Sequence, residues 1–356
     1  MSILRQITLC VLVIIALFQQ ESYAVSTDVQ SRTDQAIRLF HQCEYADALD
    51  ICEDIMQSHP ECPVGFLGAA TIYFGIMRDH WINTYEATFD SLIALAIDKG
   101  KISIEKDKEN AENYFLYGSA LGIRGLYRMK RGNWFGAFKD GLRGYRNVRK
   151  SYNMNKQIYD AYYGLGLYYY WKSVKADKLT WLPFVKDERE KGFEFIDTAV
   201  RKGEFSSMEG KFTLVQLYYF EGMYQKAYDA CASLSDRSGE NPAWLYLMAK
   251  VSAKSSLWSD AETCYSKLLE LLHASLFYHS NGFLAACHEG LAACAKAEGD
   301  VSRMERHINR ALEYVMKRNE TLEIDGPLES FESICRRLRE KANDAGTVSS
   351  RRFDEK

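Results

Sequence analysis

Two nine-residue segments of this chain align with each other, MYQKAYDAC at 223–231 and LWSDAETCY at 257–265. The alignment places Ala227 and Ala261 at the same position, 34 residues apart. A fixed step of roughly 20–50 residues indicates an array of units, each burying its apolar face against the next. This step restricts the chain to a repeat architecture before its composition is considered.

The repeated unit is predicted to be helical. Only 5 of the 356 residues are proline, and long stretches lack the alternation of polar and apolar residues that marks a half-buried strand. Hydrophobic residues make up 47% of the chain, which is enough for a large core. The net charge of −3 gives no reason to expect nucleic acid as a partner.

Residues 161–173, AYYGLGLYYYWKS, raise the alternative of a dinucleotide-binding loop. Such a loop carries G-x-G-x-x-G after a buried strand. Here Tyr169 stands in place of the third glycine, and no apolar strand precedes Gly164. With helical spacing the stretch instead becomes Y-x-x-L-G-x-x-Y, starting at Tyr162, with residues i, i+3 and i+7 on one face. Gly166 is then expected to let a partner helix approach closely.

This pattern resembles the first helix of a tetratricopeptide repeat (TPR), W-x-x-L-G-x-x-Y, with tyrosine in place of tryptophan. Residues 45–60 resemble the second helix, and the 34-residue step is the period of that family. The resemblance covers roughly residues 31–318. It implies an all-α, right-handed helical-repeat solenoid of TPR-like hairpins with irregular insertions: a lengthened hairpin around Ala137, an insertion at 173–188 and a non-standard helix around 88–97.

Both ends of the chain are predicted to lie outside the solenoid. Arg5 precedes a 12-residue apolar run, and SYA at 22–24 fits a signal peptidase site, so residues 1–24 are predicted to be a cleaved signal peptide. An uncleaved anchor is the alternative, although a membrane span needs about 20 apolar residues. Export to the periplasm or cell envelope follows. The solenoid with a C-terminal capping helix is predicted over 25–341, and a disordered tail over 342–356.

The sequence lacks the patterns of the common catalytic and metal sites: it has no H-E-x-x-H, phosphate loop, G-x-S-x-G or C-x-x-C. Cys287 and His288 come nearest to a reactive cluster, but adjacent residues point to different sides of a helix. Most cysteines are interpreted as small core residues, with one or two disulfides left open. We therefore predict a protein that is not an enzyme and uses no cofactor or metal.

Residues 124–150 hold nine Lys or Arg and one acid, Asp140. The spacing i, i+4, i+7, i+11 places four of the basic residues on one helical stripe, here called the basic stripe: Lys139, Arg143, Arg146 and Lys150. A second stripe consists of Arg124, Arg128 and Arg131. Small residues occupy the opposite face, so the basic stripe is predicted to face outward and to dock on an anionic envelope surface. The alternative is a solvated face balanced by acids elsewhere.

The inner wall of the solenoid is the predicted partner site. The resemblance implies that the first helices line a concave groove, with ligand contacts just after the first aromatic residue of the motif. The positions one and eight residues beyond that reference supply seven rings, one of which is Phe74. The other six are the predicted partner contacts: Phe115, Tyr163, Tyr170, Phe212, Tyr219 and Tyr246. Rings along a groove favour a protein or peptide partner, because each buries much area at low entropic cost. The alternative is that inserted segments cover them.

The sequence thus predicts an exported, non-catalytic scaffold that binds a protein or peptide in its groove. The alternative is a structural component of an envelope assembly, docked through the basic stripe. Open rings would favour the first function and covered rings the second, and an enzyme ranks third. The apolar loop WLPF at 181–184 is expected to fold back onto the solenoid, with an exposed contact patch as its alternative.

Overall fold

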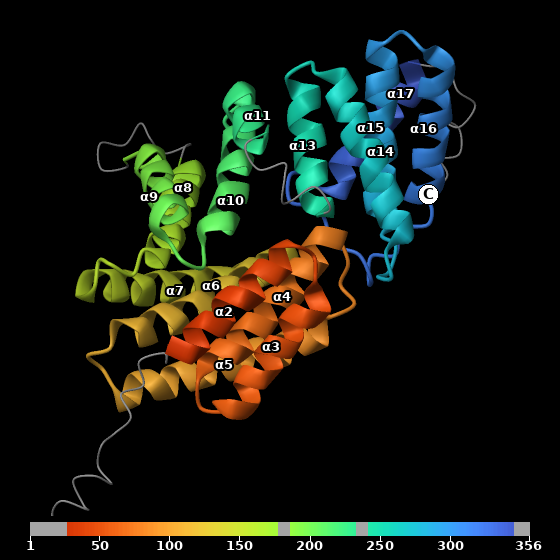
Figure 1. Ribbon diagram of the computed structural model, residues 1–356. Helices are drawn as coiled ribbons and strands as arrows, with labels where there is room; N and C mark the ends of the chain where they lie inside the picture. Colours follow the sequence, from red (N-terminus) through yellow and green to blue (C-terminus); the bar gives the residue numbers. More distant parts are fainter. Residues whose placement is uncertain (1–26, 177–185, 233–240, 345–356) are drawn as a thin grey trace, which may run out of the picture.

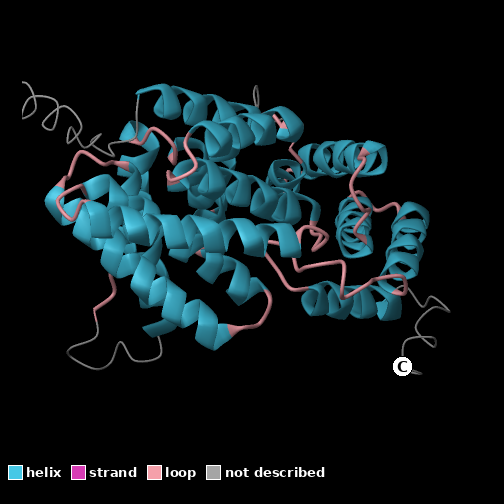
Figure 2. Cartoon of the chain, turned by 90° about the horizontal axis from the view of Figure 1, so that it is seen from below, coloured by secondary structure: helices cyan, strands magenta, loops and turns pink. Residues whose placement is uncertain are grey.

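The computed structural model describes residues 27–176, 186–232 and 241–344. Within these ranges the chain forms fifteen helices and no strand, apart from one isolated bridge between Ile82 and Glu323. The all-α prediction is confirmed, as Figures 1 and 2 show from two directions. The predicted signal peptide, the WLPF loop at 181–184 and the tail beyond 344 lie outside the described residues.

Adjacent helices pack in pairs, which form seven hairpins followed by one single helix. The pairs are α2 (Thr27–His41) with α3 (Tyr45–Ser58), α4 (Pro63–His80) with α5 (Glu86–Lys106), α6 (Ala111–Lys130) with α7 (Trp134–Met154), α8 (Asp160–Ala176) with α9 (Arg189–Lys202), α10 (Ser207–Phe220) with α11 (Tyr224–Ala232), α13 (Pro242–Lys254) with α14 (Trp258–Ala274), and α15 (Asn281–Ala297) with α16 (Val301–Val315); α17 (Phe331–Asp344) follows. This is the predicted helical-repeat solenoid.

The turn inside a hairpin repeats one backbone conformation. Gly132, Gly222 and Gly299 have φ angles of 74°, 71° and 78°, and each lies in the turn between the two helices of a hairpin. Ser256 and Cys43, with φ angles of 60° and 63°, occupy the same place in two other hairpins. Glycine adopts this left-handed conformation without steric cost, which explains its use at three of these turns. From Gly222 to Ser256 is again a step of 34 residues.

Two of the predicted irregularities have a clear outcome. The hairpin of α6 and α7 is lengthened as predicted, with helices of 20 and 21 residues. The helix expected around 88–97 is longer than predicted, because α5 spans 21 residues and packs on α4 as an ordinary second helix. The capping helix α17 continues to Asp344, three residues beyond the predicted boundary at 341.

Close glycine contacts hold the long hairpins together. A Cβ atom on Gly166 of α8 would lie 2.6 Å from Cγ1 of Ile196 and 2.8 Å from the backbone oxygen of Gly192, both on α9. On Gly118 of α6 it would lie 2.9 Å from the backbone oxygen of Gly144 on α7. The glycine pair in AYYGLG therefore belongs to helix packing, as predicted, and not to a cofactor loop.

The segment between α16 and α17 returns to the N-terminal half, where its blue trace reaches the end of α4 (Figure 1). The backbone N–H of Ile324 donates to the oxygen of Trp81 at 3.1 Å, and that of Asn83 to the oxygen of Leu322 at 2.7 Å. The Trp81 ring stacks on Phe283 of α15, with centroids 4.2 Å apart. The end of α4 therefore contacts both the segment before α17 and helix α15, which joins the N-terminal hairpins to the C-terminal ones.

Candidate functional site

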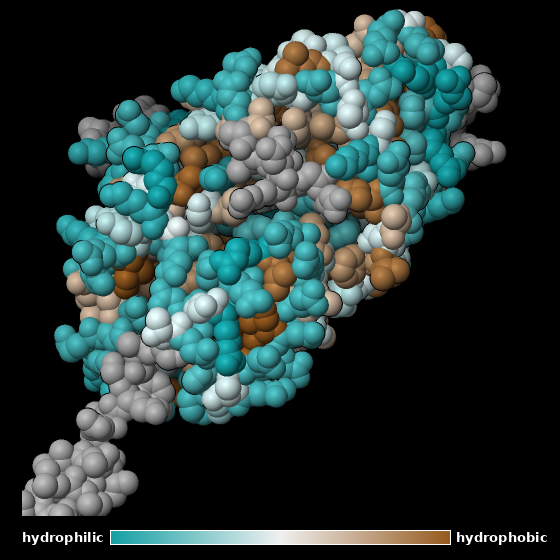
Figure 3. Space-filling model, in the orientation of Figure 1, coloured by the Kyte–Doolittle hydropathy of each residue, from teal (hydrophilic) through white to brown (hydrophobic). Residues whose placement is uncertain are grey.

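The six rings predicted to line the groove do not form one open ladder. Tyr170, Phe212 and Tyr246 are buried, with 1%, 8% and 0% of their surface exposed. As partner contacts these three are corrected to core residues, whereas Phe115, Tyr163 and Tyr219 are half-buried. On the face seen in Figure 3, apolar residues show as separate patches on a mostly hydrophilic surface. Within the described residues these three rings are covered by neighbouring repeat helices and by the segment before α17, whereas the predicted alternative named inserted segments.

Tyr246 of α13 shows what covers such a ring. It packs edge-on against Trp81 and Phe283, with centroids 5.0 and 5.4 Å away. Its hydroxyl donates to the carboxylate of Glu329, in the segment just before α17. Burial and the neighbouring Glu329 carboxylate raise the pKa of Tyr246, so the hydroxyl stays protonated. The C-terminal segment therefore fills the inner wall at α13.

Tyr170 of α8 is covered from α9 and α10. Its ring lies edge-on to Phe193 at 5.7 Å, and its hydroxyl donates to Glu221 at 2.8 Å. Burial, followed by this hydrogen bond, raises the pKa of Tyr170. The contacts from α9 and α10 thus place the ring in the core, although it lies seven residues from the half-buried Tyr163.

The helices α4, α8 and α10 meet at a group of side chains that we call the inner-wall cluster: Arg78, Tyr163, Glu209 and Phe212. Arg78 donates to Glu209 at 2.6 Å, and its guanidinium lies 5.1 Å from the centroid of Phe212. The hydroxyls of Tyr163 and Thr213 are 3.0 Å apart. A hollow of about 30 Å³ remains beside the cluster, room for about one water molecule. The cluster closes the contact between these helices and leaves no ligand-sized pocket.

The basic stripe faces outward on α7, as its spacing predicts: all four side chains are exposed. Arg143 donates to the Tyr117 hydroxyl at 2.6 Å, and Lys150 to the Tyr114 hydroxyl at 2.7 Å. Lys139 and Arg146 have no hydrogen-bond or ion-pair partner among the described residues. No carboxylate of the described part of the chain neutralises the stripe.

The second stripe behaves differently. Arg124 makes two hydrogen bonds to Asp140, at 2.7 and 2.9 Å, and Arg128 makes a third at 2.6 Å. Arg131 lies 3.4 Å from Glu86 of α5. The alternative of charges balanced by acids is therefore right for the second stripe, since Asp140 is 1% exposed and compensates two arginines.

Sequence analysis missed three aromatic residues at the start of α7. Trp134, Phe135 and Phe138 are exposed over 63%, 81% and 68% of their surfaces. The signal was present in the letters WFGAFK, where three rings directly precede Lys139. We call these three residues the aromatic tip.

A buried charge network around Glu289 was also missed. The Glu289 carboxylate accepts from Lys341 and, at 3.2 Å, from Arg337, both on α17. Glu329 bonds to Lys250 at 2.8 Å and to Arg337 at 2.6 Å. Burial alone would raise the pKa of Glu289, but Lys341, Lys250 and Arg337 outweigh it and lower the pKa to about 2. These partners are separated by 48 and 52 residues from Glu289, beyond the reach of a spacing argument.

The predicted neighbours Cys287 and His288 do not act together. Cys287 is fully buried and burial raises the pKa of its thiol, the opposite of what a nucleophile needs. His288 instead meets His307 of α16, with their Nδ1 atoms 3.0 Å apart, and stacks on Tyr314. Burial, then the charge of His307, lowers the pKa of His288 to about 4. Sequence analysis missed this pair.

The described part of the chain shows neither a cluster of metal-ligating side chains nor a disulfide among its own cysteines. No group of three or more His, Cys, Asp or Glu side chains there is placed to hold a metal ion. No disulfide joins two of the eight cysteines within the described ranges.

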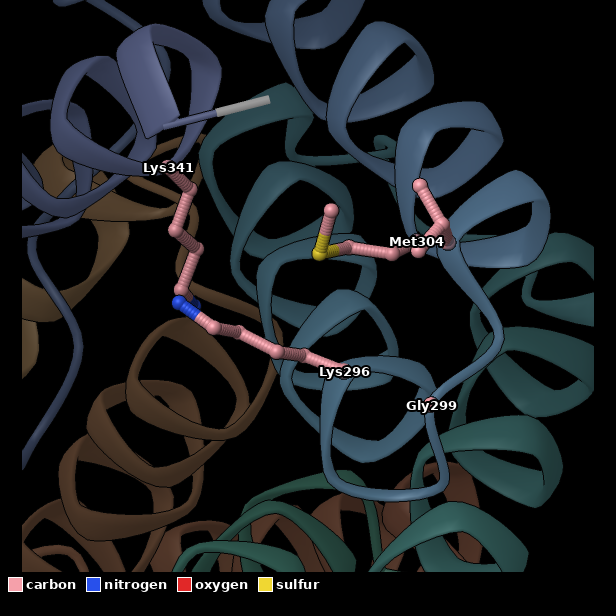
Figure 4. Close-up of a pocket in the computed structure, with 5 residues that line it drawn as sticks. Lys296, Gly299, Met304 and Lys341 are labelled. Atoms are coloured by element: carbon pink, nitrogen blue, oxygen red, sulfur yellow. The ribbon is translucent and has the colours of Figure 1, made fainter.

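Figure 4 shows a surface hollow beside the turn between α15 and α16. Its volume is about 190 Å³, and the lining residues are Lys296, Gly299, Val301, Met304 and Lys341. The side-chain nitrogens of Lys296 and Lys341 end beside one another, and Lys341 is engaged by Glu289 (Figure 4). Ligand pockets usually enclose about 300–1,000 Å³, so this hollow is a shallow depression.

No known family profile matches the sequence, and no curated protein matches it. Among solved structures, the chain is similar to the APC/C hetero-tetramer Cut9–Hcn1, with a TM-score of 0.55 at 12% identity over 92% of this chain and 51% of that one. This similarity shows the fold, an all-α solenoid of helical repeats.

Two bacterial TPR proteins are also similar. The C-terminal part of a TPR repeat-containing protein from Cytophaga hutchinsonii has a TM-score of 0.42 at 15% identity, over 81% of this chain and 97% of that one. A tetratricopeptide repeat protein from Parabacteroides merdae has a TM-score of 0.39 at 12% identity, over 88% of this chain and 98% of that one.

Within the described ranges, no helix is both long and apolar enough to cross a membrane.

Proposed function

We propose that this protein is an exported, non-catalytic scaffold of the cell envelope that binds a protein or peptide on its inner wall. One observation carries the proposal: the wall at α13 already holds a peptide segment, the chain's own residues before α17. Glu329 of that segment contacts Tyr246 and Lys250. Solenoids present such walls to extended partners, repeat after repeat.

The part of the wall left for a partner lies at α6, α8 and α10. Phe115, Tyr163 and Tyr219 are half-buried there, so each ring still offers surface to a ligand. The Tyr163 hydroxyl is engaged by the Thr213 hydroxyl, which restricts the orientation of the ring. Rings held in one orientation lose little entropy on binding, which favours them as anchors.

Site-specific photocrosslinking tests this function in the living cell. A photoreactive phenylalanine analogue replaces Phe115 or Tyr219 and, as the control, the exposed Lys226 of α11. We expect the first two positions to crosslink to the same partner and the control position not to. Crosslinks no stronger than those from Lys226 would reject the inner wall as the partner site. N-terminal sequencing of the same protein tests export, and a start at Val25 is expected.

A structural component of an envelope assembly, docked through the basic stripe, is the second candidate. Two observations favour it: half of the predicted rings are covered, and the stripe has no acidic partner in the described part of the chain. We expect Lys139→Glu with Arg146→Glu to release the protein from a washed envelope fraction. The matched control reverses Lys226 and Lys267, two exposed lysines on other second helices. Equal retention of the two variants would reject the candidate.

A further inference from the structure

The aromatic tip is the most exposed apolar group of the described surface that lies on a single helix turn. Its members follow the spacing i, i+1 and i+4, which places them on neighbouring positions of the same side of α7. Further along the helix, Gly144 and Val148 pack on Gly118 of α6. Soluble monomers rarely leave large rings clustered in solvent, and such clusters mark contact sites.

The local backbone holds the tip in place. Gly132 turns the chain in the left-handed conformation, with a φ angle of 74°. The Asn133 side chain then caps α7 by accepting the backbone N–H of Gly136 at 2.9 Å. The three rings therefore project from a fixed helix start at the end of the α6–α7 hairpin.

The charge beside the tip is of one sign. Five Lys or Arg lie on α7, and its single acid, Asp140, is buried and compensated by Arg124 and Arg128. The nearest acids of α5 lie on the α6 side, where Glu86 meets Arg131. The outward side of α7 thus combines exposed rings with uncompensated positive charge.

We propose that this side of α7 docks on an anionic lipid bilayer, with the aromatic tip in the interfacial layer and the basic stripe on the headgroups. Interfacial helices combine Trp and Phe on one side with Lys and Arg beside them. A bilayer can contact both the exposed rings and the positive charges, because it offers an apolar layer beneath anionic headgroups and requires no matched pockets. The proposal deepens the second candidate function, on which it rests, by naming the surface, and is independent of the inner wall.

Vesicle binding tests the proposal with a chain that begins at Val25. That chain retains every described helix, since α2 begins at Thr27. The probes are vesicles of phosphatidylcholine alone and of phosphatidylcholine with phosphatidylglycerol. We expect binding only to the anionic vesicles, weakening with salt because exposed charges are screened.

Two α7 variants separate the rings from the charges. Lys139→Glu with Arg146→Glu should lower the vesicle affinity more than tenfold, because each basic residue near an anionic surface contributes about fivefold. Trp134→Ser, Phe135→Ser and Phe138→Ser together should lower it at every salt concentration. The matched controls are Lys226→Glu with Lys267→Glu, and Phe220→Ser with Met223→Ser, the latter pair exposed over 41% each. Both controls should bind as the unchanged protein does.

The outcomes tell whether the outward side of α7 binds a lipid bilayer, another protein or a second copy of this chain. A blue shift of Trp134 fluorescence on adding anionic vesicles, lost in Trp134→Phe, supports insertion of the tip. Full binding by the aromatic variant overturns insertion. If the unchanged protein ignores anionic vesicles while charge reversal still releases it from the envelope, the stripe docks on a protein and only the lipid proposal fails. Concentration-dependent dimerisation abolished by the aromatic variant, without vesicle binding, assigns the tip to a second copy and overturns it as well.

Discussion

Two basic helices of this protein, α7 and α17, use their charges in opposite ways. On α17, Arg337 and Lys341 turn inward and meet Glu289. On α7, Lys139 and Arg146 face outward and meet no acid of the described chain. A run of basic residues in a sequence therefore does not tell whether a helix closes its own fold or is free to dock elsewhere.

The apolar residues of the two helices show the same contrast, buried on α17 and exposed on α7. Ile334, Leu338 and Ala342 of α17 are buried in the core around α15. The rings of the aromatic tip on α7 remain in solvent. Consequently we expect substitutions on α17 to change the stability of the fold, and substitutions on the outward side of α7 to change binding alone.

The largest effect is expected from Glu289→Ala. Removing the carboxylate leaves Arg337 and Lys341 facing a buried site without compensation, and breaking such a pair costs about 3–5 kcal/mol of unfolding free energy. Urea unfolding measures the loss. Glu332→Ala is the matched control, because Glu332 lies exposed on α17, the helix that carries Arg337 and Lys341. Equal midpoints for the two variants would show that the network does not hold α17.

Acid should weaken the same contact. The pKa of Glu289 is lowered from its ordinary value to about 2 in the fold. A carboxylate whose folded pKa is depressed stabilises the fold above its unfolded pKa of about 4.3, and that contribution, roughly 3 kcal/mol, is lost as the pH falls toward 2. Thermal melts of the unchanged protein and of Glu289→Gln should therefore converge as the pH falls through this window.

Protonation of His288 should lower stability in a different pH range. His288 has a folded pKa of about 4, below the ordinary value of 6.5. Protonation thus favours the unfolded chain, and this loss sets in between about pH 6.5 and 4. Melts of His288→Gln across that range separate the two effects. A Glu289→Gln variant that keeps the full slope below pH 4 would contradict the assignment to the carboxylate.

Two glycines of α7 should differ in how well they tolerate a side chain. A Cβ atom on Gly144 would lie 2.9 Å from the backbone oxygen of Gly118, whereas one on Gly141 would meet nothing within 4 Å. Gly144→Ala should therefore cost about 1–3 kcal/mol by overpacking. Gly141→Ala should instead gain up to about 1 kcal/mol, since alanine favours a helix. Destabilisation by both would mean that helix packing does not decide the difference.

The smallest effect is expected from Arg146→Ala on α7. This side chain is exposed and unpaired, so its removal should change the free energy of unfolding by less than about 0.5 kcal/mol. Arg337→Ala on α17 should cost clearly more, because it leaves Glu289 and Glu329 short of a partner. Denaturant melts of this pair compare the two helices directly. Similar losses of unfolding free energy in the two variants would contradict the difference in charge pairing between α7 and α17.

Local periodicity was enough to predict the repeat architecture. The 34-residue step placed Ala227 and Ala261 on second helices, and both are fully buried there. The spacing around Gly166 predicted its packing against α9, and the spacing of the basic stripe predicted that it faces outward. Each of these features depends on which side of one helix a residue occupies, and spacing along the chain determines that side.

Tertiary structure alone decided which inner surfaces stay accessible. Tyr246 is covered through Glu329, which lies 83 residues further along the chain. Tyr163 and Tyr170 share one side of α8, yet only Tyr170 is closed off, by α9 and α10. Periodicity identifies the side of a helix that will be buried, but it carries no information about which distant segment will cover that side. The repeats were therefore readable from the sequence, whereas the filling of the inner wall was not.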